Sequence, residues 1–305
     1  MKKIAKLIMA AGAVCLALSF AACSEDDEGG TPETKVELPE SKGENPFTGK
    51  SWKKESSGEG YSASTTYAFE SGTVTKTDAW NDGEDSGNSE TTYKYTYDTE
   101  KSLVYLVPSK FSGTAQNGKE YSYSSVSEAE ALLKEYGYTG DNFAAEKAGI
   151  AADFATKTVY KYEIADKALK LTEYFDGTFP SNSGFRVHDS ESRLSLKLRE
   201  GEIEFFKDSA ESGEDAEYEI YPTFEGGTFS GTVYSVGEDE ETDSRTFTSV
   251  GTVSGTYASS GTGTEGCTVK ITFTAIPDSI SIVAKNTEYT LAQDEPHPEE
   301  YTLVE

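Results

Sequence analysis

The side chains that most often perform catalysis are scarce in this sequence. Its 305 residues include only two histidines and three cysteines. His188 lies beside Asp189, a pair that could activate a serine, but no serine stands in the G-x-S-x-G arrangement of a nucleophile elbow. His297 lies between two prolines in an acidic tail and has no evident partner. We therefore expect no catalytic residue, no metal site and no cofactor, in a protein that is not an enzyme.

A glycine-rich string at residues 261–266, GTGTEG, has the G-x-G-x-x-G spacing of a dinucleotide-binding loop. Such a loop must open a helix, because the amides at the helix N-terminus hold the pyrophosphate. Here an alternating strand pattern at residues 267–273 follows instead. The string therefore indicates a hairpin loop.

The charge balance limits the possible partners. The chain has 27 basic and 54 acidic side chains and a formal charge of -27, so nucleic acid would be repelled. Two acidic runs, residues 82–85 and 238–243, carry the oxygen ligands that calcium prefers. Neither run has EF-hand spacing, and acids in hairpin loops keep sheet edges soluble. We favour solvated loops over a calcium site.

Aromatic residues are the better indication of a ligand. With 54 acids, the paired carboxylates of a glycoside hydrolase are unavoidable by chance and carry no information. Trp52 lies in an opening strand and is expected in the core. Trp80, between Ala79 and Asn81 at a strand end, is the candidate ligand-binding aromatic, for example stacking on a sugar ring.

The N-terminus has the parts of a secretory signal. Three lysines occur in the first six residues, an apolar run covers residues 4–20, and Ala21 and Ala22 precede Cys23. The run is short for a spanning helix. Its ending resembles the lipobox of bacterial lipoproteins, although Phe20 replaces the usual aliphatic residue. The resemblance implies cleavage between Ala22 and Cys23, acylation of Cys23 and a membrane anchor; the alternative is a secreted protein with an incidental Cys23.

The segment after the cysteine predicts a tether. Residues 24–45 are rich in acids, glycine and proline, a composition that buries too little apolar surface to fold. We expect residues 23–45 to form a lipidated flexible linker. The acidic cluster at residues 24–28 resembles the export signal of some surface-displayed lipoproteins, and a plain solvated linker is the alternative. Surface and periplasmic locations at the outer membrane both remain open.

The body predicts strands. From Phe47 onward, runs such as residues 91–97 and 268–273 alternate apolar and polar residues with the two-residue period of half-buried antiparallel strands. One stretch, residues 127–155, has helical spacing instead. Ser127 and Glu130 form a capping box there, and Gly137 is a stop signal. We predict an all-β meander or barrel with a short helical insertion.

A weak internal repeat predicts two units. FTGKSW at residues 47–52 resembles FEGGTF at 224–229, and FESGTV at 69–74 resembles FTSVGTV at 247–253. These motifs are similar to those of lipocalin-like β-domains of small bacterial lipoproteins. We accordingly expect a β-rich domain with the insertion over residues 46–208 and a second, smaller β-rich domain over residues 216–305.

These observations predict a membrane-anchored bacterial lipoprotein that binds an unidentified ligand or partner in the cell envelope. A lipocalin-like barrel can hold a small apolar ligand if its interior is not filled. An adhesin or structural surface protein that acts through its loops is the alternative, expected to have filled barrel interiors and an apolar or aromatic outer patch. A carbohydrate-active hydrolase would need two carboxylates and a tryptophan at one cleft. Cys15 leaves with the signal, so Cys267 would be the only free thiol.

Overall fold

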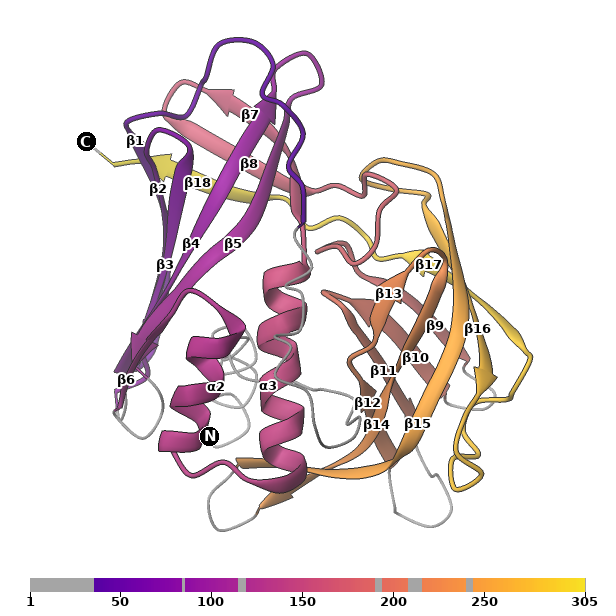
Figure 1. The fold of residues 1–305 in the computed structure, drawn as a ribbon. Coiled ribbons are helices and arrows are strands. Elements are labelled where there is room, and N and C mark those ends of the chain that lie inside the picture. Colours follow the sequence, from indigo (N-terminus) through magenta and orange to yellow (C-terminus); the bar gives the residue numbers. More distant parts are fainter. Residues whose placement is uncertain are drawn as a thin grey trace.

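The computed structural model describes residues 36–83, 86–114, 119–189, 194–207, 216–239 and 244–304. The chain forms two closed antiparallel barrels of eight strands each, with two helices between them (Figure 1). The all-β architecture with two lipocalin-like units and a helical insertion is thereby confirmed. The expected signal peptide, Cys23 and residues 24–35 of the expected tether lie outside the described residues.

The first barrel is built from strands at both ends of the described chain. Around the barrel the order is β4 (Ser86–Asp98), β3 (Thr73–Asn81), β2 (Tyr61–Phe69), β1 (Lys50–Gly58), β18 (Glu299–Leu303), β8 (Ala168–Glu173), β7 (Thr158–Ala165) and β5 (Leu103–Thr114). Strand β5 pairs with β4 and closes the barrel, and β6 (Glu120–Tyr123) extends the sheet beyond β5.

Aromatic side chains fill one end of the first barrel. Phe47 stacks on Phe69 with ring centroids 4.7 Å apart, and Trp52 meets Phe69 edge-on at 5.6 Å. Trp52 is 1% exposed, as expected for a core residue. Farther along β3, Lys76 and Asp78 occupy the same strand face as the buried Val74 and form an ion pair of 2.8 Å. The interior is therefore apolar at one end and polar toward the other.

The second barrel has an apolar interior throughout. Its order is β12 (Ala216–Ile220), β11 (Glu202–Lys207), β10 (Leu194–Arg199), β9 (Phe185–Asp189), β17 (Glu288–Gln293), β16 (Thr268–Ala275), β15 (Ser244–Ser260) and β14 (Thr228–Asp239). Strand β14 pairs with β12 to close it and also with the short β13 (Thr223–Glu225). Leu196, Phe205 and Phe273 are fully buried in one continuous core, so this barrel is filled by its own side chains.

The expected domain boundaries are wrong. Strands β9 to β11, which fall within residues 46–208, belong to the second barrel, and the segment 208–216 lies between two strands of that same barrel. The last strand, β18, belongs to the first barrel, where Leu303 pairs with Trp52 on β1 and Tyr301 with Leu169 on β8. The last strand joins the first barrel because β1 and β8 each have an edge that needs a backbone partner. Strand β18 pairs with both edges.

The second pair of repeat motifs also differs in structure. Residues 69–74 span the turn between β2 and β3, whereas residues 247–253 lie inside the single long strand β15. Gly251 has φ +141° beside an irregularity in the pairing of β14 with β15. The similar sequence motifs therefore form a turn in the first barrel and part of a bent strand in the second.

The helical insertion consists of α2 (Val126–Glu135) and α3 (Gly140–Ala155). The cap of α2 lies two residues earlier than the sequence pattern predicts. The Ser125 hydroxyl accepts a hydrogen bond from the Glu128 amide at 3.2 Å, and the Glu128 carboxylate accepts one from the Ser124 amide at 2.7 Å. Within the described residues, no helix is long and apolar enough to cross a membrane.

The expected tether ends earlier than residue 45. Lys42 pairs with the end of β4, since its amide donates to the Tyr97 carbonyl at 2.8 Å and its carbonyl accepts from the Thr99 amide at 3.2 Å. The Asn45 side chain donates to the Tyr95 hydroxyl at 2.8 Å, and Leu38 packs on the outside of the first barrel. Residues 36–45 are thus part of the folded body, held by backbone pairing that composition does not reveal.

Candidate functional site

A pocket of about 460 Å³ lies where the two barrels and the N-terminal segment meet. Its size falls in the range of small-molecule sites, about 300 to 1,000 Å³. The lining comes from the N-terminal segment, the turn between β4 and β5, the start of β5, the residues that flank β7 and β8, and the β15–β16 loop. The lining residues are Glu37, Leu38, Pro39, Lys101, Leu103, Tyr105, Lys157, Tyr174, Asp176 and Thr262.

The apolar wall of the pocket is the outer face of β5. Val104 and Leu106 point into the first barrel, so Leu103 and Tyr105 point outward by strand alternation. These outward side chains are nevertheless only 2% and 9% exposed, because Leu38 and neighbouring residues cover them. The pocket therefore has an apolar, aromatic wall outside the barrel.

An ion pair forms the polar side of the pocket. Lys157 Nζ lies 2.6 Å from Asp176 Oδ2, with the two side chains 13% and 15% exposed. The other oxygen of Asp176 accepts hydrogen bonds from the amide and the hydroxyl of Thr178, at 3.1 and 2.6 Å. Burial raises the pKa of Tyr105, and the nearby negative charge of Asp176 raises it further, so this phenol stays protonated and can donate.

The glycine-rich string positions the second barrel against this wall. It is the loop between β15 and β16, as the sequence pattern predicts. Gly263 exchanges two backbone hydrogen bonds with Phe175, at 2.8 and 2.9 Å, and adopts φ +149°, which favours glycine. The contact brings Thr262 to the pocket and holds Tyr174 and Asp176, on either side of Phe175, in its lining.

Two lining charges make no hydrogen bond or ion pair in the described part of the chain. Neither the Lys101 ammonium nor the Glu37 carboxylate makes a hydrogen bond or ion pair with any other described residue, and both side chains belong to exposed residues. The positive charge of Lys101 helps to lower the pKa of Asp98, but Asp98 already pairs with Lys42 at 3.6 Å and accepts hydrogen bonds from the backbone amides of Glu100 and Lys101.

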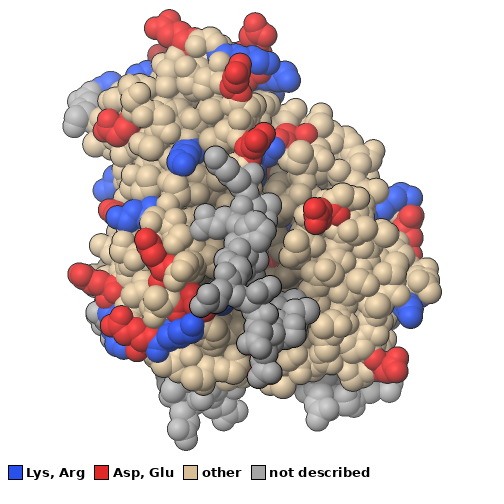
Figure 2. Space-filling model, in the orientation of Figure 1, with Lys and Arg blue, Asp and Glu red and all other residues tan. Residues whose placement is uncertain are grey.

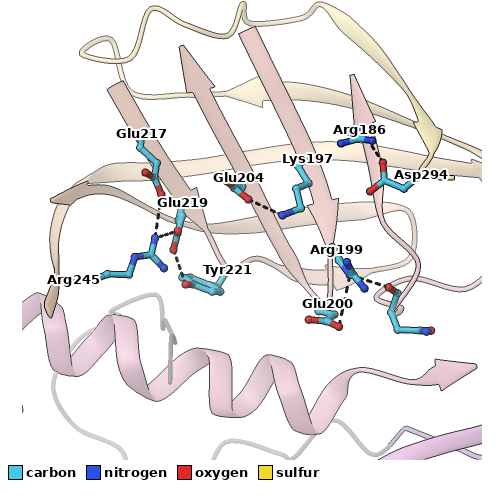
Figure 3. Close-up of polar contacts among 11 residues, drawn as sticks. Arg186, Lys197, Arg199, Glu200, Glu204, Glu217, Glu219, Tyr221, Arg245 and Asp294 are labelled. Atoms are coloured by element: carbon cyan, nitrogen blue, oxygen red, sulfur yellow. Dashed lines mark hydrogen bonds and ion pairs between the residues drawn. The ribbon is translucent and has the colours of Figure 1, made fainter. Parts of the chain in front are cut away.

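A second group of charges lies on the outside of the second barrel, facing α3 (Figure 3). Arg245 on β15 contacts Glu219, which is 2% exposed, and lies 3.1 Å from Glu217. The Tyr221 hydroxyl donates to the other oxygen of Glu219 at 2.7 Å. These contacts satisfy the buried carboxylate of Glu219 and fix the edge of the barrel wall.

Helix α3 contributes a buried acid to this interface. Glu146 is 7% exposed, and its Oε2 atom has no hydrogen-bond partner among the described residues. Burial raises the pKa of Glu146 to about 8, and the positive charge of Arg245 opposes the shift. Backbone amides of Phe247 and Ser249 donate to side chains at the start of α3, both at 2.8 Å. The group holds the helix against the barrel, and we assign it a structural role.

The candidate residues predicted from sequence do not meet at the pocket. Trp80 is half-buried on β3 and packs on Gly87 of β4, where an added Cβ would lie 2.9 Å from the indole ring. It is not among the pocket residues. Cys267 is 2% exposed inside the second barrel, and His188 is exposed on β9. Cys23 and Ala22 lie outside the described residues.

The acidic runs considered for calcium are described only at residues 82–83 and 238–239. In the described ranges, no group of three or more acidic, histidine or cysteine side chains is placed to hold a metal ion.

Sequence reasoning missed the residues that do line the pocket. One signal was available: residues 103–107, LVYLV, are apolar without alternation, which is typical of a strand covered on both faces. The contribution of Thr262 and Tyr174 had no such signal, because it depends on how the two barrels dock. Comparison of the chain with family models, curated proteins and solved structures found no match in any of the three.

Proposed function

We propose that this protein is a membrane-anchored bacterial lipoprotein whose β body binds a small ligand in the pocket between the barrels, without catalysis. The observation that carries the binding site is the 460 Å³ pocket with an aromatic wall and unpaired charges. The interior of the second barrel is filled by its own side chains, so a ligand held inside that barrel is not favoured.

The proposed anchor would place this pocket near a membrane. Acylation of Cys23, with palmitate or a similar chain, would fix the N-terminus to the cell envelope, at the surface or the periplasmic face of the outer membrane. Glu37 at the pocket is 14 residues from Cys23, which spans at most about 50 Å when fully extended. With this anchor, a ligand bound there would be held within that distance of the lipid.

An adhesin that works through an apolar outer patch is less well supported. Among the described residues the only large hydrophobic side chain that is exposed is Val304, at 48%. Acidic and basic side chains are interspersed over the face shown in Figure 2, without a field of one sign. Adhesion through polar loops stays the alternative function.

A hydrolase is not favoured by the pocket. Its lining has no tryptophan, and its only acids are Glu37 and Asp176. Asp176 is held by Lys157 and Thr178 on both oxygens, so it is not free to transfer a proton.

The binding site is tested with a variant in which a large side chain occupies the pocket. Thr262 is exposed at the rim, so Thr262→Trp should occupy the pocket without disturbing a core, and Thr287→Trp on another exposed loop is the matched control. Binding of a mixed fragment library is followed by NMR of ¹³C-labelled tyrosines. We expect fragments to shift Tyr105 and Tyr174 in the wild type and in the control, but not in Thr262→Trp. If no fragment moves either signal in the wild type, the pocket is not a binding site.

The anchor is tested separately by growing cells with a labelled fatty acid. Cys23→Ser should abolish acyl labelling and release the protein from membranes, whereas Cys15→Ser should leave both unchanged. A labelled, membrane-bound Cys23→Ser protein would disprove the anchor without affecting the pocket.

A further inference from the structure

The charges that line the pocket divide into a matched pair and two single charges. Lys157 and Asp176 neutralise each other across 2.6 Å. An ion pair that is already made, with its remaining oxygen bonded to Thr178, has little to gain from a ligand. The ligand is therefore selected by the charges that remain, Lys101 and Glu37.

The backbone of Lys101 is held in place, and its ammonium group makes no hydrogen bond or ion pair with another described residue. Its backbone amide donates to Asp98 Oδ1 at 3.1 Å, and Ser102 after it has φ +55°, so the turn between β4 and β5 has a defined shape. Asp98 is also 3.6 Å from Lys42, so two lysines share one carboxylate and one positive charge is left over. A negative group on a ligand would complete this site.

Glu37 is likewise positioned by its neighbours. Leu38, the next residue, packs into the cluster of Leu103 and Tyr105, so the backbone beside residue 37 is held at the pocket. The Glu37 carboxylate is exposed and has no partner in the described part of the chain. A positive group on a ligand would complete this second site.

The remaining wall is apolar and aromatic. Tyr105 and Tyr174 line the pocket together with Leu38 and Leu103, and the hydroxyl groups of the two tyrosines make no hydrogen bond to other described residues. Such a surface suits a hydrocarbon or aromatic group with a polar atom nearby.

We infer that the pocket binds a zwitterion with an apolar side chain, of the class of free amino acids and short peptides. Its carboxylate would face Lys101, its ammonium group Glu37, and its side chain the two tyrosines. A simple anion would leave Glu37 without a counter-charge, and a simple cation would leave Lys101 without one. This inference rests on the proposed pocket and names the chemistry of its ligand.

The test uses three probes that share one ring: L-phenylalanine, phenylacetate and phenethylamine. Their affinities for the full-length protein are measured by NMR titration of the labelled tyrosines. Lys101→Met should weaken phenylalanine and phenylacetate about three- to five-fold and leave phenethylamine unchanged or tighter, as expected for one exposed ion pair. Glu37→Gln should weaken phenylalanine and phenethylamine by a similar factor and leave phenylacetate unchanged or tighter.

The controls are Lys285→Met and Glu295→Gln, which remove the same charges from exposed positions outside the pocket and should change no affinity. If phenylalanine binds the wild type, Lys101→Met and Glu37→Gln with equal affinity, the inference that the ligand is a zwitterion is overturned. The zwitterion would also be overturned if neutral fragments shift the NMR signals of Tyr105 and Tyr174 and phenylalanine does not. In that case the binding site itself would stand. A wild type in which no probe or fragment moves Tyr105 or Tyr174 would overturn both proposals.

Discussion

Phe175 and Gly263 exchange two backbone hydrogen bonds, at 2.8 and 2.9 Å, and so connect the segment that leaves the first barrel to a loop of the second. The ring of Phe175 is fully buried in the core of the second barrel. Tyr174 and Asp176 on either side line the pocket. One short extended segment therefore both docks the barrels and builds the candidate site, so the pocket depends on the docking.

The ion pair in the pocket should stabilise the fold. Lys157→Met leaves Asp176 partly buried without its counter-charge, and we expect a loss of about 2 kcal/mol in the free energy of unfolding. Lys161→Met, at an exposed position on β7, is the control and should change little. Urea denaturation measures both, and equal midpoints for the two variants would contradict a stabilising pair.

The buried Glu146 should make stability fall as pH rises. Its folded pKa of about 8 lies above the value of an unfolded glutamate, so the folded state keeps a proton that the unfolded state releases. Between about pH 5 and 8 this single group should lower stability by up to about 1.4 kcal/mol per pH unit.

Glu146→Gln carries no titratable proton and should remove this part of the pH dependence. Thermal unfolding across the range, compared with Glu135→Gln at an exposed site on α2, provides the measurement. The contrary outcome is a wild-type stability that rises with pH, with the same pH dependence in Glu146→Gln. That result would show that Glu146 is charged in the folded state.

The thiol of Cys267 should be unreactive in the folded protein. Cys267 is 2% exposed within the second core, and burial raises its pKa, which lowers the thiolate fraction. We expect a maleimide to label it at least about 100-fold more slowly than in 6 M guanidinium, because labelling requires opening of the barrel. Rapid labelling of the native protein would show that this part of the second barrel opens readily.

The last strand should be essential to the first barrel. Tyr301 is 1% exposed, and its hydroxyl donates to Glu299 at 2.5 Å. Tyr301→Ala should cost about 3 to 5 kcal/mol, as for other large buried side chains. Hydrogen exchange should show lost protection in β1 and β8, which flank β18, with β10 and β16 unchanged. Loss of protection confined to the second barrel would contradict the closure of the first barrel by β18.

Much of the local structure follows from short-range patterns in the chain. Alternation at residues 194–198 predicts a strand with Leu194, Leu196 and Leu198 on one face, and all three are buried. The helical spacing of residues 127–155 predicts the insertion, although the cap forms at Ser125. These features depend on neighbours a few residues away, so the sequence is sufficient to find them.

The sequence by itself determined the strand-rich class, the helical insertion and the hairpin loop at residues 261–266, because backbone geometry and alternation are local properties. The pairing of β18 with β1, the pairing of the segment 36–45 with the first barrel and the pocket were decided only by the tertiary structure. Leu303 and Trp52 are 251 residues apart, and nothing in either strand identifies its partner. Which edges meet depends on barrel closure, and the pocket on how two closed barrels pack together.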